Sequence, residues 1–141
     1  MRQNPAVESL IRQNFRLNGI EPQLNMHAVT QDGRDLVFNA AANIISSSAF
    51  ERGVEGQTLT VKSEPFHEVI ARHRPDVLIM DVEGGEYELL PNADLGPIRH
   101  ILVELHPHII GEQKVEEIKA SLATAGFKEK SSDRKTFHFQ R

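Results

Sequence analysis

The 141-residue sequence contains no cysteine, no Gly-x-Gly triplet and no long hydrophobic run. Without cysteine the chain has no disulfide, no thiolate metal ligand and no cysteine nucleophile. Its apolar stretches fall short of the ~20 residues that a membrane-spanning helix needs. Residues 1–10 also lack the apolar core of a signal peptide. We therefore expect a soluble cytoplasmic protein that has no membrane partner.

An excess of positive charge is missing as well. The formal net charge is −4, and lysine and arginine are spread along the chain rather than clustered. This distribution excludes a strong electrostatic attraction to nucleic acid or to an anionic membrane. The hydrophobic content of 39% and charged content of 26% are typical of a folded soluble protein. The length predicts a single domain over residues 1–141.

Helical and strand patterns alternate along the chain. Apolar residues at helical spacing predict helices over residues 4–19, 64–74, 84–90 and 112–126. Strands are predicted over residues 24–29, 36–40, 58–62, 76–81 and 100–106, with a final hairpin in which Phe137 and Phe139 share a face. Residues 40–57 are small and polar and are interpreted mainly as loop. Strands alternating with helices predict an α/β fold.

Two of the predicted strands are apolar nearly throughout, at residues 76–81 and 100–106. Such strands are typically buried on both faces, as in a parallel sheet covered by helices. In sheets of that kind, ligands bind beyond the carboxyl ends of the strands. The sequence therefore directs attention to the residues that follow each strand.

Polar side chains follow both strands. Asp81 and Glu83 lie at the carboxyl end of the first, and Glu104 and His106 lie at the same end of the second. If the strands are parallel neighbours, these four side chains meet at one edge of the sheet. Burying a charge costs several kcal/mol unless it is paired. A cluster at this edge therefore requires a cation, a donor-rich ligand or a nearby arginine.

Each carboxylate also has a purely structural interpretation. Glu83 or Glu86 can favour the first turn of the following helix, because a helix N-terminus attracts negative charge. Glu104 can pair with Arg99 or with another basic residue. Under this interpretation the carboxylates contribute to local stability and to nothing else.

A metal site is a further alternative. Its sensible form combines oxygen and nitrogen ligands from Asp81, Glu104 and His106, and it would suit a metal-dependent hydrolase. His106 and His108 flank Pro107, however, and histidines around a proline are more often plain loop residues. We therefore predict no dedicated metal site.

The stretch "DVLIMDVEGGEYELL", followed by "ILVELHP", resembles the FkbM-type methyltransferases. In that family an apolar strand leads into Asp-x-Glu-Gly-x-Glu, then a short helix, then a second strand ending in Glu-x-His. "NPAVESLIRQNFRLNGI" and "MHAVTQDGRDLVF" resemble the segments that come before it. The resemblance extends from about Asn4 to the C-terminal hairpin. The positions that match the central motif are Asp81, Glu83, Gly84, Glu86, Leu90, Glu104 and His106.

The resemblance implies a class I, Rossmann-like fold that uses S-adenosylmethionine to methylate a hydroxyl of a sugar or small molecule. It places Asp81 beside the cofactor and the acceptor, and Gly84 would let backbone and ligand approach closely. The acceptor hydroxyl must lose a proton, which a carboxylate or an imidazole within hydrogen-bond reach can accept. Asp81, Glu83, Glu104 and His106 are therefore the candidate catalytic residues.

The family's glycine-rich turn, and the strand-end acid that holds the cofactor ribose, have no counterpart here. We therefore expect the C-terminal part of a methyltransferase domain, with an incomplete, mostly parallel sheet, flanking helices and a C-terminal hairpin. The alternative is a non-catalytic remnant that forms a homo-oligomer through its open sheet edge, because exposed strand edges pair readily with other chains.

Overall fold

The computed structural model describes residues 5–39 and 58–141. The chain divides into two compact units, Met1–Val29 with Gly33–Glu64, and Thr30–Asp32 with Pro65–Arg141. The expectation of a single domain over residues 1–141 stays a prediction. The loop expected at residues 40–57 lies outside the described residues. No helix in the described ranges is long and apolar enough to cross a membrane.

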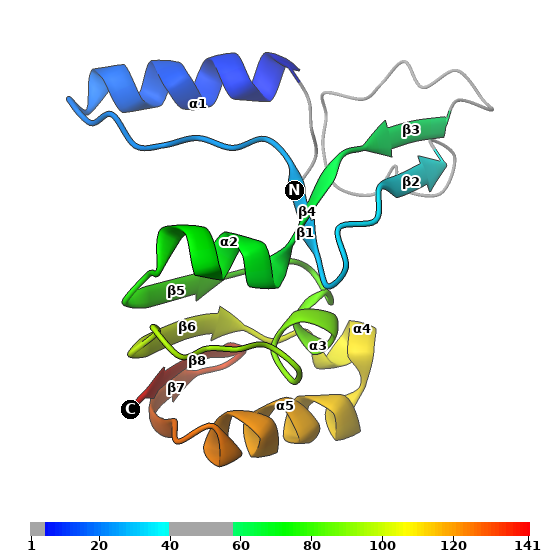
Figure 1. Cartoon of the computed structure of the whole chain (residues 1–141), viewed down its shortest axis with the longest axis vertical. Coiled ribbons are helices and arrows are strands. Elements are labelled where there is room, and N and C mark those ends of the chain that lie inside the picture. Colours follow the sequence, from blue (N-terminus) through cyan, green and yellow to red (C-terminus); the bar gives the residue numbers. More distant parts are fainter. Residues whose placement is uncertain (1–4, 40–57) are drawn as a thin grey trace. The chain divides into compact units, whose positions relative to one another are not determined.

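In its described residues the first unit holds one helix, one pair of short strands and most of a second pair, whose last residues Thr30 and Pro65 belong to the second unit (Figure 1). The elements are α1 (Pro5–Leu17), β1 (Ala28–Thr30), β2 (Leu36–Asn39), β3 (Thr58–Val61) and β4 (Ser63–Pro65). β2 pairs antiparallel with β3, and β1 pairs with β4. The strand expected over residues 24–29 therefore begins later than predicted, at Ala28.

Local chemistry explains the ends of these elements. α1 is followed by Gly19 at φ +64°, the left-handed geometry that commonly ends a helix. Near β2 and β3, Lys62 Nζ lies 2.6 Å from Oδ2 of Asp35. The hydrogen bond from Lys62 lowers the pKa of the Asp35 carboxyl. The pair joins the beginning of β2 to the end of β3 on the surface.

The second unit is built on a four-stranded sheet in the order β5-β6-β8-β7. The strands are β5 (Val77–Met80), β6 (His100–Glu104), β7 (Lys128–Asp133) and β8 (Thr136–Gln140). β5 and β6 run parallel, with Val77 opposite His100 and Met80 opposite Val103. This register brings the carboxyl ends of the two strands together.

The expectation of a mostly parallel sheet is wrong for this unit. Only the β5–β6 pairing is parallel, whereas β6–β8 and β8–β7 are antiparallel. The reason is the C-terminal hairpin, which was predicted from the sequence but adds its second strand directly beside β6. The fold class is therefore α/β with a mixed sheet.

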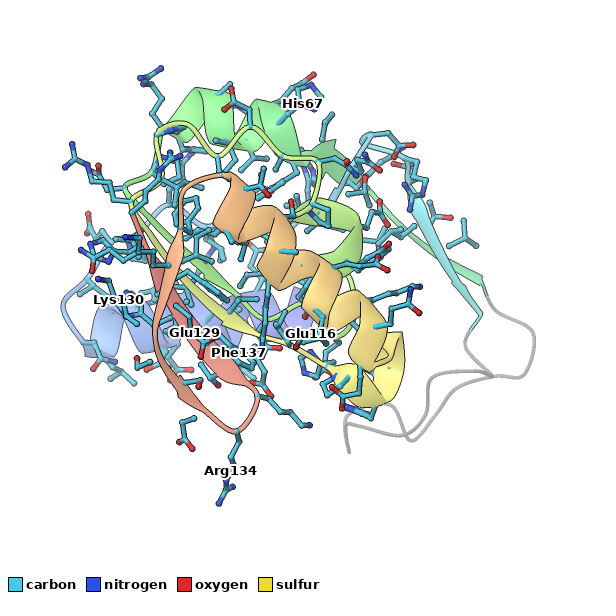
Figure 2. All side chains as sticks on the ribbon, turned by 90° about the horizontal axis from the view of Figure 1, so that it is seen from below. His67, Glu116, Glu129, Lys130, Arg134 and Phe137 are labelled. Carbon is cyan, nitrogen blue, oxygen red and sulfur yellow. The ribbon has the colours of Figure 1, made fainter. Side chains whose placement is uncertain are left out.

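Helices cover one face of this sheet. They are α2 (Phe66–His73), α3 (Glu86–Leu89), α4 (Pro107–Ile110) and α5 (Glu112–Thr124), and α5 crosses in front of the strands in Figure 2. The buried core joins side chains of β6 to those of α2, α3 and α5: Ile101, Val103, Phe66, Ile70, Leu89, Val115, Ile118 and Leu122. As predicted, Phe137 and Phe139 of β8 both pack against this core.

The opposite face of the sheet is open. Val77 is 52% exposed, Ile79 73% and Leu102 38%, whereas their neighbours Ile101 and Val103 are fully buried. Successive side chains of a strand point to opposite faces, so the helices cover only one set. The predicted burial of residues 76–81 on both faces is therefore wrong for the sheet of the second unit.

Candidate functional site

The site begins in the turn that carries the chain from β5 into α3. Glu83 has φ +53° and Gly84 has φ +102°, so two successive residues take left-handed geometry and reverse the chain sharply. A Cβ on Gly84 would lie 2.8 Å from Cγ2 of Ile109 in α4. Glycine is required at this position by both its backbone conformation and its packing.

Glu86, the first residue of α3, is fully buried. Its carboxylate turns back into the preceding loop. Oε1 accepts a hydrogen bond from the backbone N–H of Val82 at 3.2 Å, and Oε2 accepts one from Gly84 at 2.9 Å. Hydrogen bonds between a carboxylate and backbone amides are among the stronger ones in proteins. Glu86 therefore holds the shape of the loop that carries Asp81 and Glu83.

His106 enters the site from the second strand. It follows β6 by two residues, and its side chain is only 4% exposed. Its Nδ1 atom lies 3.1 Å from Oε1 of Glu86. Because Glu86 already accepts two backbone N–H groups, Nδ1–H of His106 is the donor in this contact. The Glu86 bond thus fixes the direction of the imidazole ring.

The other ring nitrogen of His106 faces three carboxylates. Its Nε2 lies 3.5 Å from an oxygen of Glu83, 3.6 Å from one of Glu104 and 3.8 Å from one of Asp81. The three acidic side chains are 74%, 37% and 58% exposed, respectively. The site is therefore a buried imidazole at the floor of an acidic rim that is open to solvent.

The four predicted site residues lie together at the carboxyl ends of β5 and β6, as their positions in the sequence indicated. The pairing of Glu104 with Arg99 is not realised, and the basic side chain near Glu104 is that of His106. Arg99 lies at the opposite end of β6, where its Nε is 3.8 Å from Asp76. No lysine or arginine in the described ranges forms an ion pair with the site carboxylates. His106 is also no plain loop residue, because it is buried.

Glu86 is the residue that the catalytic assignment from the sequence missed. A sequence signal for it does exist. Glu86 stands three and four positions before Leu89 and Leu90, which places it on the same helical face as two buried leucines. A carboxylate on an apolar face requires internal hydrogen-bond donors. The interpretation of Glu86 as a residue that only favours the first turn of a helix does not take this spacing into account.

Tyr87 ties the short helix α3 to α5. Its hydroxyl donates a 2.5 Å hydrogen bond to Oε2 of Glu117. This hydrogen bond lowers the pKa of the Glu117 carboxyl and raises the pKa of the Tyr87 hydroxyl. The next residue, Glu88, accepts a hydrogen bond from the backbone N–H of Gln31. α3 is thus anchored through Tyr87 and Glu88, the two residues between the buried Glu86 and Leu89.

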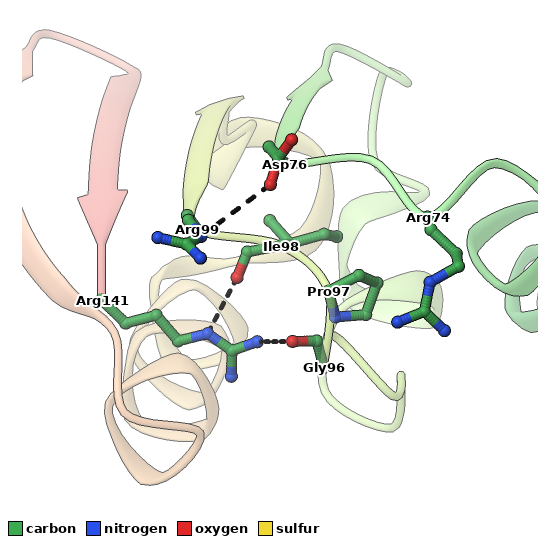
Figure 3. A pocket seen from close by; sticks show the side chains of 7 residues that line it. All are labelled: Arg74, Asp76, Gly96, Pro97, Ile98, Arg99 and Arg141. Carbon is green, nitrogen blue, oxygen red and sulfur yellow. Dashed lines mark hydrogen bonds and ion pairs between the residues drawn. The ribbon is translucent and has the colours of Figure 1, made fainter.

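A cavity of about 590 Å³ lies at the opposite, amino ends of β5 and β6 (Figure 3). Arg141 there donates hydrogen bonds to the carbonyl oxygens of Ile98, Gly96 and Leu95. These contacts use the guanidinium to close the end of the sheet rather than to receive a ligand. We therefore place the candidate site at the acidic edge of the sheet, formed by Asp81, Glu83, Glu104 and His106, and not in the cavity at the other end of the strands.

One of three comparisons with known proteins found a match, and it covers most of the chain. The model of one protein family, described as the methyltransferase FkbM domain, matches residues 4–129. No curated protein and no solved structure matches the chain. The family match includes α1, the β5–α3 motif and β6, and so contains every residue of the acidic site.

Proposed function

Because the chain belongs to the FkbM methyltransferase domain family, we propose that it transfers a methyl group from S-adenosylmethionine to a hydroxyl of a sugar or other small molecule. The observation that supports this proposal is the convergence of Asp81, Glu83 and Glu104 on the buried His106. We also infer a class I, Rossmann-like fold. The parallel β5–β6 pair, followed by an antiparallel hairpin beside β6, supports it.

The negative charges of the acidic edge are complementary to the positive charges of the cofactor. S-adenosylmethionine supplies a methyl group on a positively charged sulfur and also carries an ammonium group. Asp81 and Glu83 present carboxylates to solvent beside His106, and in the described ranges neither pairs with a lysine or an arginine. Asp81 would hold the cationic part of the cofactor, and Gly84 would shape the adjacent backbone. The conformation of Gly84 is also explained by its packing against Ile109.

The protein groups at this edge can accept the proton that the acceptor hydroxyl loses. Such a group must come within hydrogen-bond reach of the hydroxyl. The carboxylates of Asp81, Glu83 and Glu104 each have an oxygen within 3.8 Å of the Nε2 atom of His106. The rigid Glu86–His106 contact keeps the imidazole in position for such a transfer.

Isothermal titration calorimetry with S-adenosylhomocysteine tests the proposal. We expect the protein to bind the compound and Asp81→Asn to bind it at least tenfold more weakly. Asp76→Asn is the matched control, because Asp76 stands at the other end of the same strand. Absence of binding, or equal weakening by both substitutions, would contradict the proposed role of this edge.

A second candidate function is self-assembly without catalysis. It is favoured by the open face of the sheet, where Val77, Ile79 and Leu102 are exposed beside His100 and His138. In the described ranges β5 pairs with β6 alone, and an edge strand of this kind can pair with a second copy of the chain. Light scattering decides between the candidates. An assembly that grows with protein concentration, together with no binding of S-adenosylhomocysteine, would favour this function over methyl transfer.

A further inference from the structure

We propose that Asp81, Glu83 and His106 form a binding site for a divalent transition-metal cation, with Mn²⁺ as the representative ion. Each residue offers one ligand atom, and these atoms all lie within 4.8 Å of one another. All three belong to the second unit. This site differs from the metal site considered from the sequence, because Glu83 takes the place of Glu104.

The spacing of the ligand atoms supports a cation rather than direct hydrogen bonds. Nε2 of His106 lies 3.5 Å from Glu83 and 3.8 Å from Asp81, beyond the usual hydrogen-bond range of about 2.7–3.2 Å. Two ligands bound to one cation at about 2.1 Å lie about 3.0–3.4 Å apart, depending on the coordination geometry. Small rotations of the two exposed carboxylates would close the remaining difference.

The orientation of His106 is a second, independent argument. Its side chain is 4% exposed, its Nδ1 atom is bonded to Glu86, and Nε2 makes no hydrogen bond within the described ranges. A histidine that binds a metal usually donates its other ring N–H to a carboxylate or carbonyl, which fixes the ring and its tautomer. The buried pair therefore has the arrangement expected of a ligand and its supporting carboxylate. Glu86 is a positioning residue in this account.

Charge and ligand type narrow the choice of ion. Two carboxylates of the site face a nitrogen ligand without a lysine or arginine partner in the described part of the chain, so a cation would relieve their repulsion. Imidazole suits Zn²⁺, Fe²⁺ and related ions, and carboxylates suit Mn²⁺. A mixed set of one imidazole and two carboxylates therefore favours a transition-metal cation over Ca²⁺, which prefers an all-oxygen shell. Because Asp81 and Glu83 are more than half exposed, a bound ion would keep coordination positions open to water or substrate.

Metal binding itself does not depend on the proposed methyl transfer. The role of the bound cation in catalysis does rest on that proposed function. A cation at this site would bind the oxygen of the acceptor hydroxyl and orient it. Glu104, 3.6 Å from Nε2 of His106, would then be the carboxylate that the ion does not use. Because Nε2 of His106 would be bound to the ion, Glu104 rather than His106 would then accept the proton of the acceptor hydroxyl.

Titration of the metal-free protein with Mn²⁺, followed by electron paramagnetic resonance, tests the proposal. We expect one bound ion per chain in the wild type, and at least tenfold weaker binding in Asp81→Asn and Glu83→Gln. Glu86→Gln should weaken binding by about 10–100-fold, as substitutions of supporting residues do. Asp76→Asn and His108→Gln are controls, and we expect them to bind as the wild type does. Circular dichroism confirms that each variant is folded.

Two results would overturn the assignment. One is no bound Mn²⁺ at millimolar concentration. The other is binding that Asp81→Asn and Glu83→Gln leave unchanged, which would place the ion elsewhere. Titration of metal-free protein with S-adenosylhomocysteine is a separate measurement, so failure of the metal site and failure of the methyltransferase proposal can be distinguished.

Discussion

Nδ1 of His106 and Oε1 of Glu86 lie 3.1 Å apart, and both side chains are buried. This contact joins the chain that follows β6 to the first residue of α3. Glu86 in turn holds the backbone N–H groups of Val82 and Gly84. One buried carboxylate therefore supports both halves of the candidate site, the loop after β5 and the imidazole after β6.

Replacing Glu86 by glutamine should destabilise the protein. The amide keeps the volume of the side chain but cannot accept hydrogen bonds at both ends. At least one of the buried donors from Val82, Gly84 or His106 then loses its partner. The expected loss is about 1–3 kcal/mol in the free energy of unfolding, measured by urea denaturation.

Glu83→Gln is the matched control for that substitution, because Glu83 is in the same loop but 74% exposed. Its expected change is within about 0.5 kcal/mol. Equal effects of the two substitutions would show that the buried network around Glu86 does not stabilise the fold.

Gly84→Ala should destabilise the protein through both conformation and contact. Gly84 has φ +102°, and the added Cβ would meet Ile109 at 2.8 Å. The left-handed conformation alone costs about 1–2 kcal/mol in a residue with a Cβ. Gly126→Ala provides the comparison, because Gly126 has φ +90° but open space around it.

The difference between the two glycine variants isolates the clash. We expect Gly84→Ala to lower the urea midpoint further than Gly126→Ala does, and the added substitution Ile109→Ala to recover part of that difference. Identical midpoints for the two glycine variants would mean that the contact with Ile109 is easily relieved.

The Tyr87–Glu117 hydrogen bond predicts a defined pH dependence of stability. It lowers the pKa of Glu117, so its contribution is present above the ordinary value of 4.5 and is lost as the pH falls through the lowered pKa. It raises the pKa of Tyr87 above 10.0, so the contribution is complete below that value and is lost as the pH rises through the raised pKa.

Tyr87→Phe removes this bond and leaves the ring in place. The difference in unfolding free energy between wild type and variant should be constant between pH 4.5 and pH 10.0 and should shrink on either side. Urea denaturation at a series of pH values measures it. A difference that does not change with pH would exclude the assigned cause.

Replacing an isoleucine by alanine should reduce the stability of the protein much more on one face of the sheet than on the other. Ile101→Ala removes a fully buried side chain, and we expect a loss of about 2–5 kcal/mol. Ile79 is 73% exposed on the other face, and Ile79→Ala should change stability by no more than about 0.5 kcal/mol. A large loss for Ile79→Ala at low protein concentration would show that this face is covered in solution.

The sequence predicted the site better than the sheet around it. Charged residues that follow two apolar strands indicate where a site lies, because parallel strands bring their carboxyl ends to the same edge of the sheet. The burial of each strand face was not predictable in the same way. Val77 and Ile79 are as apolar as the buried Ile101, and only the placement of the helices on one face distinguishes them.

Short elements were also missed. β4 (Ser63–Pro65) and α4 (Pro107–Ile110) span three and four residues, too few to show a periodic pattern. α4 nevertheless matters to the site, because Ile109 restricts Gly84 and Pro107 follows His106 directly. Residue spacing predicted which side chains approach each other, whereas the turns that orient them became evident only in three dimensions.

Mapping the binding of S-adenosylmethionine by nuclear magnetic resonance tests the central claim most directly. In ¹H–¹⁵N spectra of the labelled protein, added cofactor should shift the backbone amides of residues 81–86 and 104–106. Shifts confined to the arginine-lined cavity at residues 74, 96–99 and 141, or no shifts at all, would contradict the assignment of the acidic edge as the methyltransferase site.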